Sequence, residues 1–350
     1  MAQSDWNRLR WVISLAAAGG LFWVAYVEIM HALGLLRLTE PVGWRVFIGG
    51  ALIFGAAAAF EFYVYQTNRG AVLRRLPYGF SVLAHVLILL AIMATVLAML
   101  RLPTYYLQVK ELGELAMRPA ILRDASLGVV VTLVFIAWSE VRSLIGPRTL
   151  RNVVLGRYRQ PRRENRIFAF IDVAGSTGLA ATLGDERFYA FLARFFAEID
   201  DIIVDHGGEV HAYVGDAVIA TWPLAAGRVD GEVVASVMAM RRHIAKVASQ
   251  FQTLFGHVPR FRVAIHGGPV VAGECGQSKR QITYLGDVVN VCARLEQAAK
   301  AQNRKTVISQ SLLDRLVLPP GVRADPLGEV ALKGVSQPMQ VSALEEERQI

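Results

Sequence analysis

The fold of the C-terminal half is decided by the stretch Arg166-Ile-Phe-Ala-Phe-Ile-Asp-Val-Ala-Gly-Ser-Thr177. Its apolar run contains β-branched and aromatic residues, which predicts a buried strand. The strand delivers one carboxylate, Asp172, to its C-terminal end, and small residues then open a helical pattern. Such an arrangement suits a metal-bound phosphate, because the carboxylate holds the cation while free N–H groups at the helix start face the anion. The alternative is an aspartate that merely precedes a helix.

A second stretch supplies another carboxylate. The run Gly207-Gly-Glu-Val-His-Ala-Tyr-Val-Gly-Asp-Ala-Val-Ile-Ala-Thr-Trp222 predicts two short strands joined by a tight turn at Gly215-Asp216. The turn places Asp216 at a hairpin tip, where it can face Asp172 of the neighbouring strand. Two carboxylates this close repel each other unless cations lie between them, so the pair predicts a Mg²⁺ site.

A third stretch completes the pattern. The run Arg280-Gln-Ile-Thr-Tyr-Leu-Gly-Asp-Val-Val-Asn-Val-Cys-Ala-Arg-Leu-Glu296 predicts a strand followed by a helix. Asn290 and Arg294 are four residues apart and therefore share one helix face. In this order, the three stretches closely resemble the catalytic domain of class III nucleotidyl cyclases, and the resemblance extends over about residues 166–344. It implies an α+β ferredoxin-like core; the alternation of strands and helices by itself suggests one sheet covered by helices on one face.

The resemblance also implies a reaction and a metal site. In this family the ribose 3′-OH of a nucleoside triphosphate attacks the α-phosphorus and expels pyrophosphate. The two Mg²⁺ or Mn²⁺ ions of each site would be held by Asp172, Asp216 and the carbonyl of Val173. Backbone N–H groups would receive the β- and γ-phosphates in the turn formed by Ala174, Gly175, Ser176 and Thr177.

Further roles follow from the same resemblance. Asn290 would orient the ribose, Arg294 would stabilise the transition state, and Lys333 would bind phosphate. Because the metal ligands in this family come from one subunit and the Asn/Arg pair from the other, the resemblance implies a head-to-tail homodimer with two equivalent sites.

The choice of base depends on two positions. Adenylyl cyclases of this class usually carry Lys four residues before the second metal-binding Asp, and here that residue is Ala212. The partner position is Thr283, which matches an adenylyl subgroup that uses Thr. These residues favour ATP over GTP as substrate. Since side chains alternate along a strand, His211 is predicted to point to the face opposite Ala212.

The N-terminal part is predicted to be a membrane domain. The chain has 350 residues, a net charge of +8 and 54% hydrophobic residues, and its apolar excess lies in the first ~145 residues. Runs of membrane-spanning length predict about four helices, over residues 11–36, 44–65, 78–100 and 121–145. A cleaved signal peptide is the alternative for the first run, which is too long for one. Most clustered Arg residues flank these runs, which indicates membrane topology rather than nucleic-acid binding.

Charge distribution predicts the orientation and the domain limits. Arg-rich short segments place both termini and the catalytic half in the cytoplasm, in a multi-pass protein of the inner (plasma) membrane. The predicted domains are a transmembrane domain (1–145), a coupling helix or linker (146–164) and a catalytic domain (165–350). The linker is predicted either to pair with its twin in a dimer or to lie on anionic lipid.

Ionisable residues inside the predicted spans are Glu61, His85 and Glu140. All three are predicted towards the cytoplasmic side, and the hypothesis is a polar cluster that senses or transmits a signal. Interhelical hydrogen bonding with a purely structural role is the alternative. Bound haem, metal or lipid is not specified by the sequence.

Other classes of protein fit less well. A guanylyl cyclase shares the metal-binding pattern, but its usual Glu does not match Ala212. A diguanylate cyclase shares a Gly-Gly-Glu-Val run but leaves Asn290 and Arg294 unexplained. A membrane receptor with a degenerate cyclase fold is a non-enzymatic alternative, which the intact Asp pair argues against. About four spans with few central charges make a poor transporter.

Overall fold

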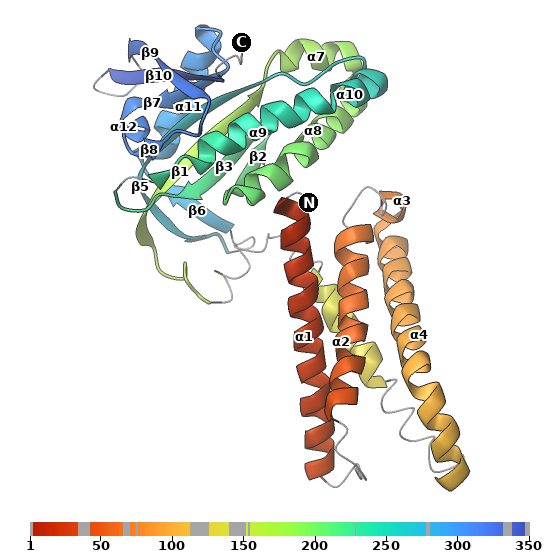
Figure 1. Ribbon diagram of the computed structural model, residues 1–350. Helices are drawn as coiled ribbons and strands as arrows, with labels where there is room; N and C mark the ends of the chain where they lie inside the picture. Colours follow the sequence, from red (N-terminus) through yellow and green to blue (C-terminus); the bar gives the residue numbers. More distant parts are fainter. Residues whose placement is uncertain are drawn as a thin grey trace. The chain divides into compact units, whose positions relative to one another are not determined.

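The computed structural model describes residues 3–33, 43–65, 71–74, 76–112, 126–139, 152, 155–227, 229–277, 281–331 and 338–346. The chain divides into two compact units, residues 1–147 and 148–350. The described part of the first unit is helical, whereas the second combines strands and helices (Figure 1).

The N-terminal unit is built from long apolar helices. They are α1 (Gln3–Ala32), α2 (Gly43–Phe60), the π-helical turn η1 (Glu61–Tyr65), α3 (Ala71–Arg74), α4 (Tyr78–Leu112) and a shorter apolar helix, Ser126–Ser139. By length and composition, three segments can cross a membrane: Leu9–Ala32, Val46–Tyr65 and Gly79–Val96. These coincide with the first three predicted spans. The fourth is described only over Ser126–Ser139, and the rest of it lies outside the described residues.

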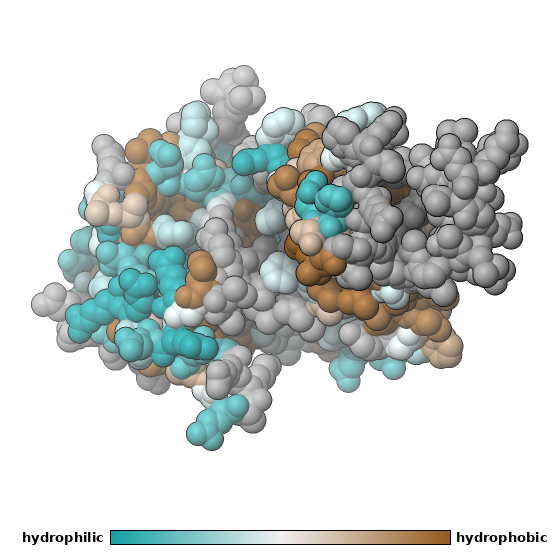
Figure 2. Space-filling model, turned by 90° about the horizontal axis from the view of Figure 1, so that it is seen from below, coloured by the Kyte–Doolittle hydropathy of each residue, from teal (hydrophilic) through white to brown (hydrophobic). Residues whose placement is uncertain are grey.

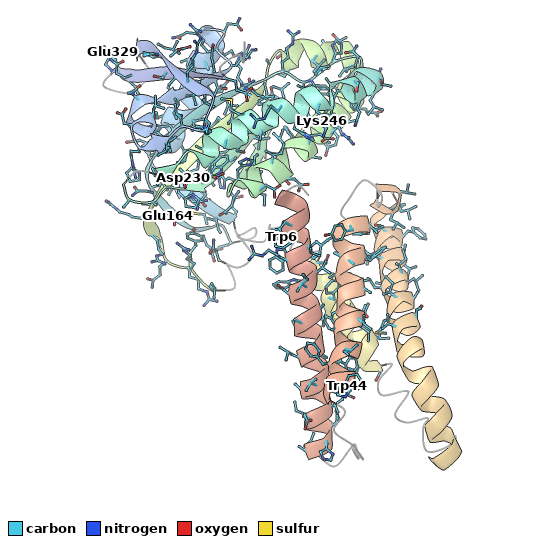
Figure 3. The ribbon with its side chains drawn as sticks, viewed as in Figure 1. Trp6, Trp44, Glu164, Asp230, Lys246 and Glu329 are labelled. Atoms are coloured by element: carbon cyan, nitrogen blue, oxygen red, sulfur yellow. The ribbon has the colours of Figure 1, made fainter. Side chains whose placement is uncertain are left out.

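Glycines let α1 and α2 pack side by side (Figure 1). A Cβ atom on Gly19 would lie 2.3 Å from Cγ of Phe54, and one on Gly50 would lie 2.5 Å from the Gly19 carbonyl. Close backbone approach of this kind is typical of helix pairs in membranes. Trp6 and Trp44 lie exposed near opposite ends of the pair (Figure 3), and tryptophan is enriched at both membrane–water interfaces.

The surface of this unit is apolar. Large hydrophobic side chains are exposed on α1 and α4, among them Leu21, Ile29, Leu83 and Leu87. Figure 2 shows hydrophobic residues gathered in one part of the molecular surface. Soluble proteins rarely expose apolar patches of this extent. The surface therefore suits contact with lipid, as the sequence predicts.

The C-terminal unit is built on an eight-stranded mixed sheet. Its strands are β1 (Arg162–Val173), β2 (Glu209–Val214), β3 (Ala217–Pro223), β5 (Phe261–Cys275), β6 (Gln281–Leu285), β7 (Thr306–Ser309), β9 (Val322–Val330) and β10 (Met339–Glu346). They pair in the order β2-β3-β1-β5-β7-β10-β9, and β6 pairs with β5. A separate pair consists of β4 (Val229–Asp230) and β8 (Leu316–Val317).

The strand order confirms the predicted ferredoxin-like core. In β2-β3-β1-β5, each neighbouring pair is antiparallel. Helix α8 (Asp185–Asp205) connects β1 to β2, and α9 (Glu232–Lys246) lies between β3 and β5 in the chain. This βαββαβ order with a split crossover defines the ferredoxin-like arrangement.

The two faces of β1 pack against different helices. The remaining helices are α7 (Ser176–Leu183), α10 (Ala248–Phe255), α11 (Asp287–Ala301) and α12 (Gln310–Leu313). Ile167 and Ile171 belong to the core shared with α8, α9 and α10. Phe168 packs with Val288 and Cys292 of α11 on the opposite face. The prediction that helices cover one face is therefore wrong, because periodicity shows that α11 has an apolar side but not which side of the sheet receives it.

The start of the sheet differs slightly from the predicted domain limit. β1 begins at Arg162, before the predicted start of the catalytic domain at residue 165. Residues 146–151 and 153–154 of the predicted coupling helix or linker lie outside the described residues. Tyr158, predicted to belong to that helix, is buried against Phe168 and Tyr284 of the sheet.

Candidate active site

The register of β1 and β3 brings the two predicted metal-binding carboxylates together. Asp172 pairs with Ala217, and Asp216 directly precedes Ala217 in the β2–β3 turn. The turn requires a positive φ of 62° at Gly215, which a residue with a Cβ adopts at a cost. The hairpin predicted from the sequence thus delivers Asp216 to the end of β1.

The charge of each carboxyl group acts on the other. The pKa of Asp172 is raised to about 6, first by burial and then by the negative charges of Asp216 and Glu296, and Asp216 also hydrogen-bonds to it. Lys300 opposes this shift. Among the described residues, no three His, Cys, Asp or Glu side chains converge on one point. A cation between the two aspartates would therefore draw further oxygen ligands from the main chain or from a substrate.

The turn after β1 opens α7 as predicted. Gly175 has a φ of 75° and a ψ of 22°, and α7 begins at Ser176. A Cβ atom on Gly175 would meet nothing within 4 Å, so the space beside the turn is open. The first N–H groups of a helix lack partners within the helix and can receive an anion. The N–H of Ala174 is already used, since it donates to the Arg260 carbonyl at 2.7 Å.

The predicted Asn/Arg pair lies on α11, and Asn290 is exposed while Arg294 is half-buried. The sulfur of Cys292 lies 3.3 Å from the Phe168 carbonyl, which fixes the level of this helix turn along β1. Asp172 follows Phe168 by four residues, about 13 Å at the rise of a strand. The structure thus separates Asn290 from the carboxylate pair of its own chain.

The other end of α11 agrees with this separation. Glu296 and Lys300 are the α11 charges that act on Asp172. Lys300 follows Asn290 by ten residues, about 15 Å along a helix. Helix α11 therefore approaches the carboxylate pair with its C-terminal half, and sequence reasoning missed Glu296 and Lys300 as neighbours of Asp172. Finding these two residues would have required a prediction of the strand against which α11 packs.

The predicted orientation of His211 is wrong. The β2–β3 register shifts between Val210 and Ala212, which is the mark of a β-bulge at His211. His211 therefore lies on the same face as Ala212, and its ring centroid lies 5.0 Å from that of Tyr284. Burial, and then the positive charge of Arg166, lower the pKa of the His211 imidazole.

Thr283, the second residue predicted to select the nucleotide base, lies on β6. Thr283 pairs with Gly273 of β5 and is half-buried. Its neighbour Tyr284 is buried, and burial raises the pKa of the Tyr284 hydroxyl. Lys333, the predicted phosphate-binding lysine, lies outside the described residues.

Two of the three predicted polar residues of the membrane unit meet. His85 Nε2 lies 2.9 Å from Glu61 Oε2, and both side chains are buried. Ser139 donates a hydrogen bond to the other Glu61 oxygen at 2.5 Å, and the ring of Tyr65 stacks on His85 at 3.9 Å. Glu140 lies outside the described residues. Sequence reasoning missed Ser139 and Tyr65, because uncharged polar residues are common in membrane helices.

Comparison with known proteins identifies the domain. The family described as adenylate and guanylate cyclase catalytic domain matches residues 159–345, more than half of the chain. The chain belongs to this family. Adenylate cyclase 2 of Rhizobium meliloti (strain 1021) is 43% identical over 205 residues, which cover 59% of this chain and 56% of that relative. An adenylate cyclase of Anabaena cylindrica is 29% identical over 182 residues, 51% of this chain and 35% of the relative.

The relatives are matched over only part of their own length. Guanylate cyclase 2G of Rattus norvegicus is 28% identical over 171 residues, covering 47% of this chain and 15% of that relative. The chain thus spans about half the length of the first of these relatives and less of the others. A bacterial light-regulated adenylyl cyclase has a TM-score of 0.54 at 19% identity, over 69% of each chain, and is similar in fold.

Proposed function

We propose that this protein is a membrane-spanning adenylyl cyclase that converts ATP to 3′,5′-cyclic AMP and pyrophosphate. The observation that carries the proposal is the contact between Asp172 and Asp216 at the end of β1, beside the open start of α7. The similarity to a relative named adenylate cyclase, at 43% identity, supports ATP as the substrate. Thr283 supports the same choice, whereas Ala212 leaves a guanylyl cyclase as the second candidate.

The residues present fit a site for divalent cations. Two Mg²⁺ or Mn²⁺ ions would be held by Asp172, Asp216 and the main-chain carbonyl of Val173, which are the hard oxygen ligands that such ions prefer. The pKa of Asp172 is raised first by burial and then by the negative charge of Asp216, and bound cations would relieve that repulsion. When bound, the cations spread negative charge during in-line displacement at the α-phosphorus.

The remaining residues would bind and orient the nucleotide. The N–H groups at Gly175, Ser176 and Thr177 would receive the terminal phosphates, because the helix start presents donors and the positive end of its dipole. Asn290 would orient the ribose so that its 3′-OH lies in line with the leaving pyrophosphate. Arg294 would stabilise the charge that develops on the α-phosphoryl group. Lys333 would bind the polyphosphate.

We propose that two copies of the chain share each site, in a head-to-tail homodimer. The separation of about 13 Å between Asp172 and the α11 turn that bears Asn290 supports this, since both must reach one nucleotide. Exposed apolar side chains flank both half-sites: Val214 beside the Asp216 turn is 57% exposed, and Leu285 before α11 is 61% exposed. A partner that covers both half-sites would remove these two side chains from water.

The membrane unit is proposed to regulate this activity. Its termini and the cyclase domain would lie in the cytoplasm, as its Arg-rich segments predict. Glu61 and His85, with Glu140, would form the cluster that senses or transmits a signal, and the contact between Glu61 and His85 supports this role. The alternative is a structural hydrogen bond between helices. If His85→Ala changed neither the regulation of activity nor any absorbance of a bound cofactor in membranes, the sensing role would be abandoned.

The decisive experiment for the proposed function measures the product. Purified full-length protein is given ATP or GTP with Mg²⁺ or Mn²⁺, and cyclic nucleotide is quantified. Cyclic AMP is expected, and Asp172→Asn should reduce it by at least about 100-fold. The matched control is Asp325→Asn on β9, which removes a surface carboxylate paired with Arg323 and should keep the activity.

Other outcomes separate the alternatives. Cyclic GMP as the main product would replace the adenylyl by the guanylyl assignment. Absence of any cyclic nucleotide from a folded protein would favour the receptor with a degenerate cyclase fold.

A further inference from the structure

A buried guanidinium lies on the sheet face that carries Asp172. Arg166 is 5% exposed and precedes Asp172 by six residues on β1, so both side chains lie on the same face. Its Nε donates to Thr221 Oγ1 of β3 at 3.1 Å, and the Thr221 hydroxyl in turn donates to the Ile167 carbonyl at 2.9 Å. Its guanidinium carbon lies 5.0 Å from the centroid of the Tyr284 ring of β6.

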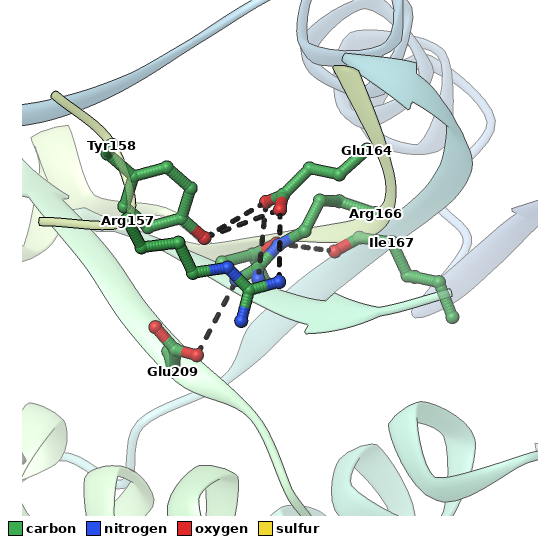
Figure 4. Close-up of polar contacts among 7 residues, drawn as sticks. Arg157, Tyr158, Glu164, Arg166, Ile167 and Glu209 are labelled. Atoms are coloured by element: carbon green, nitrogen blue, oxygen red, sulfur yellow. Dashed lines mark hydrogen bonds and ion pairs between the residues drawn. The ribbon is translucent and has the colours of Figure 1, made fainter. Parts of the chain in front are cut away.

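Arg166 is shared between two acids rather than locked to one. Its Nη1 lies 3.6 Å from Glu164 Oε1, and its Nη2 lies 3.7 Å from Glu209 Oε1 (Figure 4). Both distances exceed the range of a hydrogen bond, and Nη2 has no hydrogen-bond partner among the described residues. A buried Arg usually makes short, forked bonds to a carboxylate. A small movement of either acid therefore shifts the balance between the two ion pairs.

One of the two acids is tied to the segment that enters the sheet. We call residues 155–160 the entry segment; only Pro161 separates them from β1, and they follow the N-terminal unit in the sequence by a few residues. The Tyr158 hydroxyl donates to both oxygens of Glu164, at 3.3 and 3.4 Å (Figure 4). Tyr158 is 2% exposed, and its carbonyl accepts a hydrogen bond from the Glu274 N–H at 3.0 Å. The position of the entry segment thus sets the position of the Glu164 carboxylate.

The other contacts of Arg166 lead to both half-sites. Glu209 is the first residue of β2, whose far end leads into the turn that bears Asp216. Tyr284 lies in β6, directly before the helix that bears Asn290. The polar contacts Tyr158–Glu164–Arg166–Glu209 form a continuous chain from the entry segment to the Asp216 hairpin. We call these four residues the Arg166 relay.

We propose that Arg166 is a positioning residue that couples the entry segment, through the Arg166 relay, to the hairpin bearing Asp216; the catalytic part of this inference rests on the proposed function. A buried ion pair is weak evidence for stability, because apolar residues of similar size often stabilise as well. In this protein, the buried ion pairs would instead favour one relative position of the entry segment and the hairpin over others. Movement of the entry segment changes how Arg166 is divided between Glu164 and Glu209, and therefore the placement of Asp216.

A double-mutant cycle in the full-length protein tests the relay. Tyr158→Phe removes only the hydroxyl that binds Glu164, and Glu209→Gln removes only the charge at the far end. The two side chains are joined through Glu164 and Arg166. Each single variant should lower kcat with little change in KM for ATP. The kcat of the double variant should differ by about threefold or more from the value expected if the two single effects multiplied. Effects that simply multiply would overturn the relay.

Control variants separate positioning from general stability. Tyr213→Phe removes a hydroxyl from β2 that belongs to a different pair, with Asp200, and its effect should multiply independently with that of Tyr158→Phe. Arg166→Lys keeps the positive charge and should retain more activity than Arg166→Met. Equal activity of the Lys and Met variants would mean that the charge does not matter, which would also overturn the proposal.

A second measurement does not depend on catalysis. Hydrogen exchange followed by mass spectrometry compares wild type with Tyr158→Phe in the full-length protein. Faster exchange is expected in residues 209–223, which form the β2–β3 hairpin, and unchanged exchange in β9 and β10. Unchanged exchange in the hairpin would refute the coupling. If the wild type made no cyclic nucleotide but the hairpin responded, the proposed function would fail and the relay would stand.

Discussion

The separation of the two half-sites makes one prediction quantitative. Asp172 lies about 13 Å along β1 from the level at which α11 contacts Phe168. Asn290 lies about 9 Å along α11 from Glu296 and about 15 Å from Lys300, the two α11 residues whose charges act on Asp172. Asp216→Ala and Asn290→Ala therefore damage different halves of a composite site, and each variant by itself should be inactive.

Co-expression of the two variants should restore a defined activity. If equal amounts pair at random, about half of the dimers contain one chain of each kind. In such a dimer, the metal ligands of the Asn290→Ala chain meet the intact Asn290 of its partner, while the second site carries both defects. One site in two is active, so the mixture should reach about one quarter of the wild-type specific activity. Sites contained within one chain would give no recovery.

The assay requires proof that mixed dimers form. The two variants carry different affinity tags, sequential purification isolates mixed dimers, and cyclic AMP production is measured on this fraction. The matched control pairs Asp216→Ala with Asp172→Ala, because both changes damage the same half and no intact site can form. Absence of activity in purified Asp216→Ala/Asn290→Ala dimers would refute the shared site, and activity in the control pair would refute the assignment of the carboxylates.

Two further predictions concern stability. Burial lowers the pKa of His266 to about 4, while its Nδ1 lies 2.7 Å from Ser309 Oγ. As the pH falls, the unfolded chain takes up a proton on this imidazole before the folded chain does. The free energy of unfolding should therefore drop by about 2 kcal/mol from pH 7 to pH 5. In His266→Gln, the free energy of unfolding measured by urea pulse proteolysis should fall less over the same pH range. At Gly208, a Cβ atom would lie 2.6 Å from the Trp222 ring, so Gly208→Ala should destabilise by about 1–3 kcal/mol. Gly178→Ala, in α7 with nothing within 4 Å, should not destabilise in the same assay; equal loss would contradict the packing argument.

Local pattern determined a large part of this protein. Long apolar runs predict membrane helices because only a helix of about 20 residues satisfies its own backbone across a bilayer. Likewise, the alternation around Gly215 and Asp216 predicts the hairpin, since a tight turn between two strands leaves few other arrangements. These two features depend on residues close together in the sequence. The contact between Asp172 and Asp216 also requires the long-range register of β1 against β3.

The tertiary structure decided the features that depend on register and on side. One bulged residue at His211 turns its imidazole to the face of Ala212, because an extra residue reverses the alternation of a strand. Helix α11 carries Asn290 and Arg294 as predicted, but it packs on the sheet face that also bears Asp172, and its contact with Phe168 sets their distance from that carboxylate. Periodicity reports that a helix has an apolar side, whereas long-range pairing chooses what that side contacts.

Arg166 is a clear example of a residue whose role depends on the tertiary structure. In the sequence it is one basic residue at the start of an apolar run. Only folding surrounds it with Glu164, Glu209 and Tyr284, which come from three different strands. When the surrounding elements exclude water, a buried charge loses free energy of hydration, so its ion-pair partners must be correctly placed. The sequence by itself determined which segments are long and apolar enough to cross a membrane and which carboxylates are candidates for a site. The tertiary structure decided the strand register that brings those carboxylates together and the buried charges around them.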